Sequence, residues 1–167
     1  MAARAPREPK NPKTCHERAL GLLAVRLRSR RELELRLMRA GFEQQEVAEV
    51  LGRLEAVGLI DDEAFARAVA EHVFGTRRSG AIAVRQALGA KGVAGDTVDA
   101  IVAELGEGEE ERAVALARSR VGRLAGLPPD KAYGRLVGLL ARRGYPSSIA
   151  RRAARLALEV DEGEIEP

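Results

Sequence analysis

The chain has 167 residues, of which 46% are hydrophobic, 32% are charged and 3% are aromatic, with no Trp and one Cys. This composition excludes a disordered chain, a large multidomain enzyme and a disulfide framework, and no apolar run reaches the ~20 residues that cross a bilayer. Because Ala, Leu, Arg and Glu dominate while aromatic residues are few, the composition favours an all-α fold. Residues 1–13 are basic and Pro-rich without an apolar segment, so we expect no secretory signal and a cytoplasmic location.

Charge is segregated along the chain, although the formal net charge is only +3. Residues 1–31 carry 9 basic and 2 acidic side chains, residues 32–111 carry 8 and 17, residues 112–158 carry 11 and 1, and residues 159–167 carry none and 5. Charged faces kept for solubility usually mix both signs. The basic blocks therefore indicate surfaces for a polyanion or for an acidic protein.

Three signatures at residues 37–42, 88–93 and 140–145 divide the chain into repeats of about 50 residues. Each has a Leu followed four residues later by a Gly that can end a helix, and a second apolar-faced segment follows each Gly. The pattern predicts three helices in each repeat, at 14–27, 30–40 and 43–57, at 62–74, 80–91 and 95–105, and at 107–126, 129–143 and 146–159. We expect a curved, elongated array of three tandem three-helix repeats, comprising residues 13–58, 59–106 and 107–160, between a disordered basic tail (1–12) and an acidic tail (161–167).

Polar residues and prolines mark several of the predicted helix starts. Ser29 and Glu32 have the spacing of a capping box, and Ser79 can cap the second helix of the middle repeat. The carboxylates at 61–63 suit the positive end of the first helix of that repeat. Prolines at 128, 129 and 146 suit first-turn positions in the third repeat.

Several segments resemble the signature sequences of the RecX family, the bacterial regulators of the RecA recombinase. They are Leu22-Leu23-Ala24-Val25-Arg26 followed by Ser29-Arg30-Arg31-Glu32-Leu33, then Gly58-Leu59-Ile60-Asp61-Asp62-Glu63-Ala64-Phe65-Ala66, and Leu88-Gly89-Ala90-Lys91-Gly92-Val93. The resemblance covers about residues 17–158. It implies three tandem three-helix units in a curved monomer that lies in the groove of the RecA filament on single-stranded DNA. Bound there, family members inhibit strand exchange, ATP turnover and coprotease activity, which links them to DNA repair and the SOS response.

The chain departs from the family pattern in the first helix of the middle repeat. The family often has an aromatic residue and then a basic residue there, where this chain has Val69 and Val73. The resemblance therefore does not carry a contact made by those two side chains over to this protein.

Residues that could carry enzymatic chemistry are few, so we expect no enzyme, no catalytic residue, no metal and no cofactor. Asp61, Asp62 and Glu63 are better explained as helix-capping residues than as a metal cluster, because no His or fourth ligand is near. Cys15 forms no catalytic motif with His16 or His72. The sequence contains neither a GxxxxGK[ST] phosphate loop nor a GxGxxG fingerprint, so any effect on ATP turnover would be indirect.

Basic residues carry the functional prediction. They lie at the junctions between first and second helices and at the end of the third repeat, and the candidate contacts with a filament or with DNA are Arg26, Arg28, Arg30, Arg31, Arg77, Arg78, Arg142, Arg143, Arg151, Arg152 and Arg155. The spacing of the last three places them on one helix flank. Such residues suit DNA phosphates or an acidic RecA surface, so we expect the RecA filament and single-stranded DNA, directly or through RecA, as partners of a monomer, and no membrane. The alternative is a stand-alone DNA-binding regulator with helix-turn-helix-like units.

Overall fold

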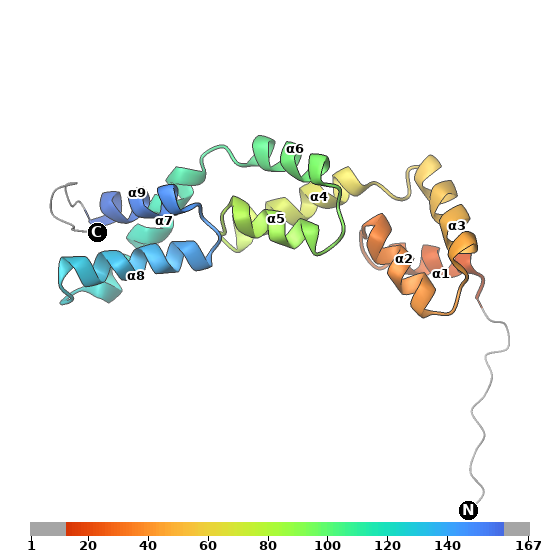
Figure 1. The fold of residues 1–167 in the computed structure, drawn as a ribbon, viewed down its shortest axis with the longest axis horizontal. Coiled ribbons are helices and arrows are strands. Elements are labelled where there is room, and N and C mark those ends of the chain that lie inside the picture. Colours follow the sequence, from red (N-terminus) through yellow and green to blue (C-terminus); the bar gives the residue numbers. More distant parts are fainter. Residues whose placement is uncertain (1–12, 159–167) are drawn as a thin grey trace, which may run out of the picture. The chain divides into compact units, whose positions relative to one another are not determined.

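The computed structural model describes residues 13–158. Within this range the chain is helical and has no strand, which confirms the all-α prediction (Figure 1). Its elements are α1 (Cys15–Leu23), α2 (Arg30–Arg39), α3 (Gln44–Ala56), α4 (Asp62–Glu71), the π-helical turn η1 (His72–Thr76), α5 (Ala81–Gly89), α6 (Gly95–Leu105), α7 (Glu109–Val121), the 3₁₀ turn η2 (Gly122–Leu124), α8 (Pro129–Arg142) and α9 (Ser147–Leu158). The tails predicted at 1–12 and 161–167 lie outside the described residues.

The chain forms two compact units, which we name the N-terminal unit (residues 1–61) and the C-terminal unit (residues 62–167). In the N-terminal unit, α1, α2 and α3 pack around one core. Small side chains of α1 face larger apolar ones of α2 and α3 there, and the fully buried residues include Cys15, Ala19, Leu33, Leu37 and Leu51. The apolar residues at three- and four-residue spacing therefore face inward as predicted.

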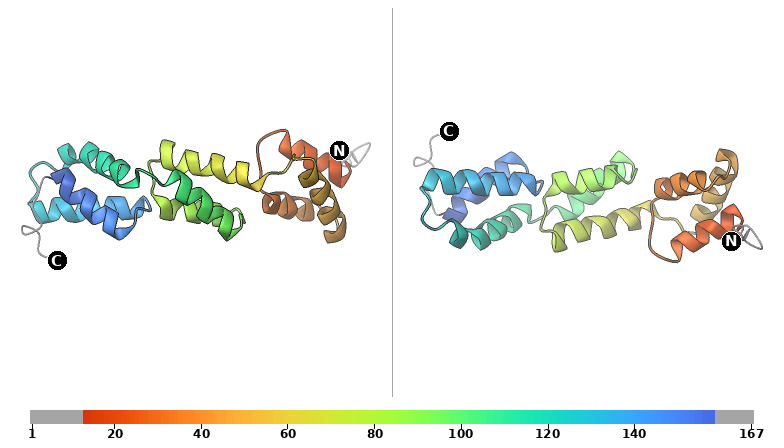
Figure 2. Two further views of the ribbon diagram at one scale, coloured as in Figure 1. Left: turned by 90° about the horizontal axis from the view of Figure 1, so that it is seen from above. Right: turned by 90° about the horizontal axis from the view of Figure 1, so that it is seen from below.

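The C-terminal unit contains two cores, one formed by α4, α5 and α6 and one by α7, α8 and α9 (Figure 2). In the second core, α7 and α9 meet through alanines, including Ala113 and Ala117 on α7 and Ala150 and Ala154 on α9. Small side chains let helix axes approach closely. The many alanines of the sequence therefore lie where two helices of this core meet.

The first helix of the middle repeat changes its winding at η1. Phe65 and Phe74 are both buried in the same core, although nine residues of regular α-helix would place them on opposite sides. Because a π-helical turn has more residues per turn, it rotates Phe74 back toward that core. The ring of Phe74 also lies 4.9 Å from the guanidinium of Arg112 in α7, so it contacts the third repeat as well. Val69 and Val73 pack in the core of the middle repeat.

Two helix ends in the N-terminal unit are fixed by side chains. The Ser29 hydroxyl accepts a hydrogen bond from the Glu32 N–H at 3.1 Å, as its spacing predicts. The predicted helix over 14–27 ends earlier, at Leu23, because the buried side chain of Arg28 folds back and donates through Nε to the Leu22 carbonyl at 3.1 Å. A carbonyl in the last turn of a helix has no partner within the helix, so Arg28 supplies one.

The prediction that Ser79 caps α5 is wrong. The N-cap residue is Gly80, and the Ser79 hydroxyl donates instead to the Arg77 carbonyl. A carboxylate from the third repeat takes the capping role, since Glu109 Oε1 accepts from the Ala81 N–H at 2.6 Å. A carboxylate at the first turn also complements the positive end of the helix dipole.

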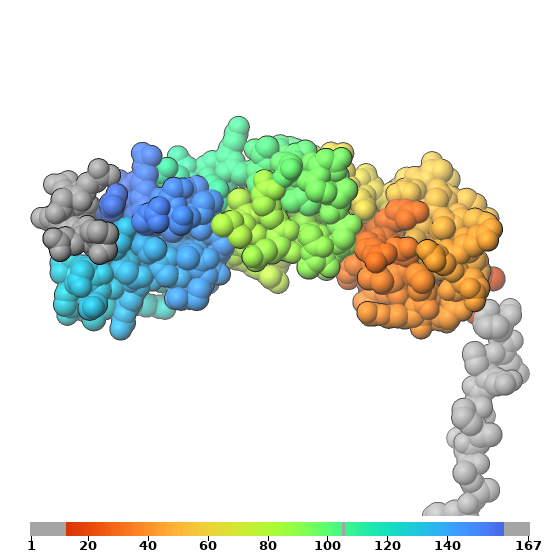
Figure 3. All heavy atoms as spheres, viewed as in Figure 1, coloured from red at the N-terminus to blue at the C-terminus, as the bar shows by residue number. Residues whose placement is uncertain are grey.

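The second and third repeats are joined by their backbones, and Figure 3 shows their surfaces in continuous contact. The Gly80 N–H donates to the Arg143 carbonyl at 2.8 Å, and the Ile82 N–H donates to the Gly144 carbonyl at 3.0 Å. A Cβ on Gly80 would lie 2.5 Å from the Gly144 carbonyl oxygen, and a Cβ on Gly144 would lie 2.5 Å from the Ala83 nitrogen. Only glycine therefore fits at these two positions of the junction.

Side chains close the same junction. The Tyr145 hydroxyl donates to the Arg78 carbonyl at 3.1 Å, and the Arg143 guanidinium donates to the Arg77 carbonyl. Tyr145 is buried, and burial raises the pKa of its hydroxyl. Tyr145, which follows the glycine of the third signature, therefore packs at the junction.

Gly144→Ala tests the junction. Gly144 has φ +79, so alanine carries left-handed strain as well as the clash with Ala83, and we expect the free energy of unfolding to fall by about 3 kcal/mol or more. Hydrogen exchange of the Gly80 and Ile82 amides should accelerate. The matched control is Gly126→Ala, where φ is +89 but nothing lies within 4 Å of the added Cβ, so the loss should be only about 1–2 kcal/mol. Equal losses in the two variants would contradict the role of the close approach.

Candidate functional site

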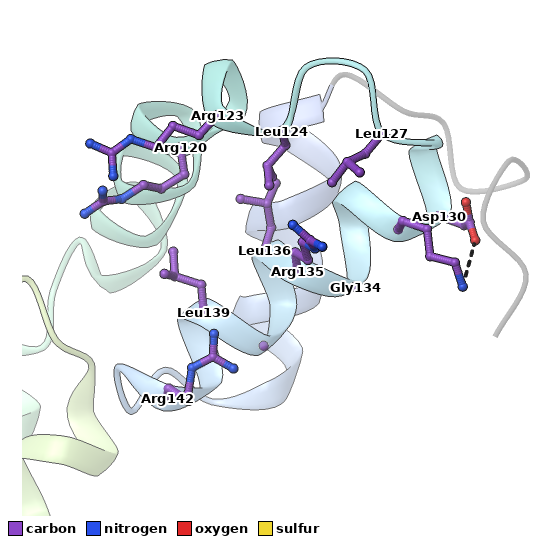
Figure 4. A pocket seen from close by; sticks show the side chains of 12 residues that line it. Arg120, Arg123, Leu124, Leu127, Asp130, Gly134, Arg135, Leu136, Leu139 and Arg142 are labelled. Carbon is purple, nitrogen blue, oxygen red and sulfur yellow. Dashed lines mark ion pairs between the residues drawn. The ribbon is translucent and has the colours of Figure 1, made fainter.

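A groove in the third repeat, which we name the third-repeat groove, has a volume of about 840 Å³. It runs between α8 on one side and the end of α7 with η2 and the following loop on the other (Figure 4). Leu124, Leu127, Leu136 and Leu139 give it apolar walls. The groove can therefore accept apolar groups between its charged edges.

Arginines occupy both edges of the groove. Lys131, Arg135 and Arg142 come from α8, where spacings of four and seven residues place them on one face. Arg120 and Arg123 extend from the opposite edge, as the sticks in Figure 4 show. The arrangement brings five basic side chains around one apolar hollow.

Among the described residues, no acidic side chain pairs with the groove arginines. Within the described part of the chain, Arg120, Arg123, Arg135 and Arg142 form no ion pair, and the groove's one carboxylate, Asp130, lies 3.8 Å from Lys131. Unpaired guanidiniums are planar donors suited to phosphate or carboxylate oxygens. The groove is therefore a candidate site for an anionic partner.

The predicted basic residues of the N-terminal unit are mostly engaged within it. Arg26 pairs with Glu32 at 2.9 Å, and this hydrogen bond raises the pKa of its guanidinium. Arg31 pairs with Glu34 at 2.6 Å. Arg30 pairs with Glu55 at 3.2 Å, so three of the four predicted arginines of this unit form ion pairs within it.

Arg28 differs from these three because it is buried, with a relative exposure of 7%. Burial lowers the pKa of its guanidinium, and its Nε is held by the Leu22 carbonyl. It acts as a capping residue of α1 in this structure.

Three predicted contact residues lie at the junction of the second and third repeats. Arg143 uses its guanidinium on the Arg77 carbonyl, so this side chain holds the fold. Arg77 and Arg78 contribute their carbonyls to the junction while their side chains are exposed. Arg78 adopts φ 49, a left-handed conformation uncommon for a side chain other than glycine.

The remaining predicted residues are divided between two places. Arg142 joins the third-repeat groove, whereas Arg151, Arg152 and Arg155 lie on α9, which does not line it. Arg151 is exposed, and Arg152 pairs with Glu110 of α7 at 2.9 Å. The predicted flank on α9 is therefore partly neutralised.

Sequence reasoning missed most of the groove. Lys131 and Arg135 were not singled out. Arg118, Arg120 and Arg123 were expected not all to face one ligand, and of these three only Arg120 and Arg123 line the groove. The spacing of positions 131, 135 and 142 is a signal that could have revealed one basic face of α8. A second, smaller hollow of about 430 Å³ in the N-terminal unit was also missed, and it is lined by Arg18, Leu22, Glu32, Leu35, Arg36, Arg39 and Ala40.

In the described residues, a metal-binding cluster or a reactive cysteine would be a sign of enzymatic chemistry. No cluster of three His, Cys, Asp or Glu side chains that could hold a metal occurs among them. Cys15 is fully buried, and burial raises the pKa of its thiol. Among residues 13–158 no helix has the length and apolarity needed to cross a bilayer.

The fold and the basic groove define a class of protein, an all-helical repeat protein of three three-helix domains. Family models described as RecX first, second and third three-helix domains match residues 15–54, 61–101 and 108–154. The chain belongs to the RecX family. It is 40% identical over 146 residues to the regulatory protein RecX of Streptomyces coelicolor, covering 87% of this chain and 77% of that protein. It is also 40% identical over 154 residues to the regulatory protein RecX of Mycolicibacterium smegmatis, covering 86% and 81%.

Solved structures share the fold. The crystal structure of RecX from Lactobacillus salivarius superposes with a TM-score of 0.81 at 19% identity, covering 87% of this chain and 96% of that one. A second crystal structure of a regulatory protein RecX gives a TM-score of 0.75 at 24% identity, covering 83% of this chain and 70% of that one. The relatives' name makes this chain one of a family of regulatory proteins.

The different environments of Arg28 and Arg31 give a testable difference in stability. Arg28→Ala removes a buried side chain and its hydrogen bond to Leu22, so the free energy of unfolding should fall by about 1–3 kcal/mol. Arg31→Ala removes a surface ion pair, and the loss should stay below about 1 kcal/mol. Urea denaturation of both variants measures this, and equal values would show that Arg28 is not a capping residue.

Proposed function

We propose that this protein modulates the RecA recombinase by binding, without catalysis of its own. It binds the RecA filament on single-stranded DNA in the cytoplasm and suppresses strand exchange, ATP turnover and coprotease activity. Membership of a family of regulatory proteins supports a regulatory role, and the resemblance to the RecX family supports RecA as the partner. The observation that supports the contact surface is the third-repeat groove, where four arginines that form no ion pair with residues 13–158 surround an apolar hollow.

The chemistry of the groove fits single-stranded DNA or an acidic protein segment. Guanidiniums pair with phosphate or carboxylate oxygens, while leucine side chains cover the apolar parts of such a ligand. On the α9 flank, Arg151 and Arg155 extend the basic surface of this repeat in the proposal, whereas Arg152 is paired with Glu110. The arginines whose side chains are held by carboxylates or carbonyls of their own unit contribute less.

The first prediction concerns activity. A titration of this protein into RecA on single-stranded DNA should inhibit the DNA-dependent ATPase, and the protein alone should hydrolyse no ATP. An inhibitor that acts on a filament should do so below one molecule per RecA protomer. Unchanged RecA turnover at an excess of this protein would refute the proposal.

A stand-alone DNA-binding regulator is the alternative, because basic three-helix units also occur in helix-turn-helix readers. Such a reader should prefer one duplex sequence over others at a fixed salt concentration. A filament modulator should show little preference and should need RecA for its main effect.

A second prediction concerns the groove arginines. The double variant Arg123→Ala/Arg135→Ala removes two charges that have no ion-pair partner among the described residues. The slope of log affinity for single-stranded DNA against log salt should therefore fall by up to roughly 0.7 per lost phosphate contact. Inhibition of RecA should weaken with it. If the groove binds acidic RecA surface instead, inhibition should fall while binding to free DNA changes little.

The matched control is Arg67→Ala/Arg85→Ala in the middle repeat. It removes the same charge, but Arg67 pairs with Glu63 and Glu104, and Arg85 pairs with Asp99. Its inhibition and salt slope should therefore stay close to those of the wild-type protein. Equal effects of the two double variants would show that net charge, not the groove, governs binding.

A further inference from the structure

We propose that residues 159–167 of this chain dock in the third-repeat groove. This segment has the sequence Glu-Val-Asp-Glu-Gly-Glu-Ile-Glu-Pro, with five carboxylates, no basic residue and two aliphatic side chains, Val160 and Ile165. The groove has the complementary composition of arginines around leucine side chains. The positive charges of the groove complement the carboxylates of the segment, and the leucines of the groove can contact its two aliphatic side chains.

The connection to α9 places the segment within reach. Helix α9 ends at Leu158, which packs against the same core as the groove residue Leu124. Figures 1 and 2 show that the end of α9 and the beginning of α8 lie at the same end of the C-terminal unit. Nine residues can span up to roughly 30 Å, and the face of α8 from residue 130 to residue 142 extends over about 18 Å. The segment is long enough to pass the loop before α8 and to run along the groove.

The electrostatics favour this occupant. Arg123, Arg135 and Arg142 have no carboxylate partner among the described residues, whereas Arg67 and Arg85 of the middle repeat are paired with carboxylates. A tethered segment occurs at an effective concentration of order millimolar, so pairing with a dissociation constant of about a millimolar fills the groove for about half of the time. The interaction should weaken strongly at 1 M salt, where the Debye length is about 3 Å.

The consequence of docking rests on the proposed function. If the groove binds the RecA–DNA filament, residues 159–167 compete with phosphates or acidic side chains of that filament for the same arginines. The segment would then lower the affinity of the protein until a polyanion of higher charge displaces it.

Paramagnetic relaxation in the full chain tests the docking without RecA or DNA. Gly163→Cys supplies one accessible thiol for a nitroxide label, while the buried Cys15 stays unlabelled in the native protein, as the identically treated wild-type chain will verify. Amide signals of Leu127, Arg135 and Leu139 should lose more than half of their intensity at low salt and recover at 1 M salt. Unchanged intensities at low salt would overturn the proposal.

Variants separate specific docking from proximity. Replacing Glu159, Asp161, Glu162, Glu164 and Glu166 by their amides keeps the length of the segment and should abolish the signal loss, as should Arg123→Ala/Arg135→Ala. The control Arg67→Ala/Arg85→Ala should retain it. Equal signal loss in all of these variants would overturn the proposal. A mixture of spin-labelled ¹⁴N chains and unlabelled ¹⁵N chains reports contact between molecules, and signal loss of the same size in that mixture would also overturn it.

DNA binding distinguishes failure of the docking from failure of the proposed function. Deleting residues 159–167 should raise the affinity for single-stranded DNA roughly threefold or more at low salt, as expected when a tethered competitor is removed. The same deletion in the Arg123→Ala/Arg135→Ala background should have little effect. The relaxation experiment can show docking while the groove variant Arg123→Ala/Arg135→Ala keeps the DNA affinity and the RecA inhibition of the wild-type protein. That result would support the docking and would refute the groove as the filament contact.

Discussion

The backbone contact between Gly80 and Gly144 is the constraint on which the C-terminal unit depends. Because neither residue has a Cβ, the turn before α5 and the turn before α9 approach closely enough for two backbone hydrogen bonds. That approach brings the Glu109 carboxylate to the first turn of α5 and the Arg143 guanidinium to the Arg77 carbonyl. The second and third repeats therefore form one compact unit although each has its own core.

The sequence predicted the helices well because their signals are local. Apolar spacing, turn glycines and the Ser29 cap lie within a few residues of the ends that they determine, and those helices occur where they were predicted. The errors occur where a distant or buried group decides the outcome. Glu109 caps α5 in place of Ser79, and the buried Arg28 ends α1 early. The π-helical winding of η1, which brings Phe74 into the core, also escapes a prediction based on a regular 3.6-residue period.

The candidate site was predicted less completely for a related reason. Composition located the excess of basic charge in residues 112–158, and the spacing along α8 contains the face that carries Arg135 and Arg142. The opposite edge of the groove depends on how α7 and η2 pack against α8, which no local pattern encodes. Pairing depends on tertiary structure in the same way, since the partner of Arg152 is Glu110 on another helix.

Pairing decides which of the many arginines can gain energy from an anionic partner. An arginine held by a carboxylate must exchange one anion for another when it binds phosphate, so its net gain is small. An unpaired arginine that contacts a phosphate releases a condensed counterion from the nucleic acid without losing a partner of its own, so it makes its full contribution to the free energy of binding. Arg26, Arg31 and Arg152 belong to the first kind. Arg135 and Arg142, which form no ion pair in the part of the chain that the structure describes, belong to the second. In the proposed binding, the contribution of the third repeat thus depends on where its acidic residues are missing as much as on where its basic residues lie.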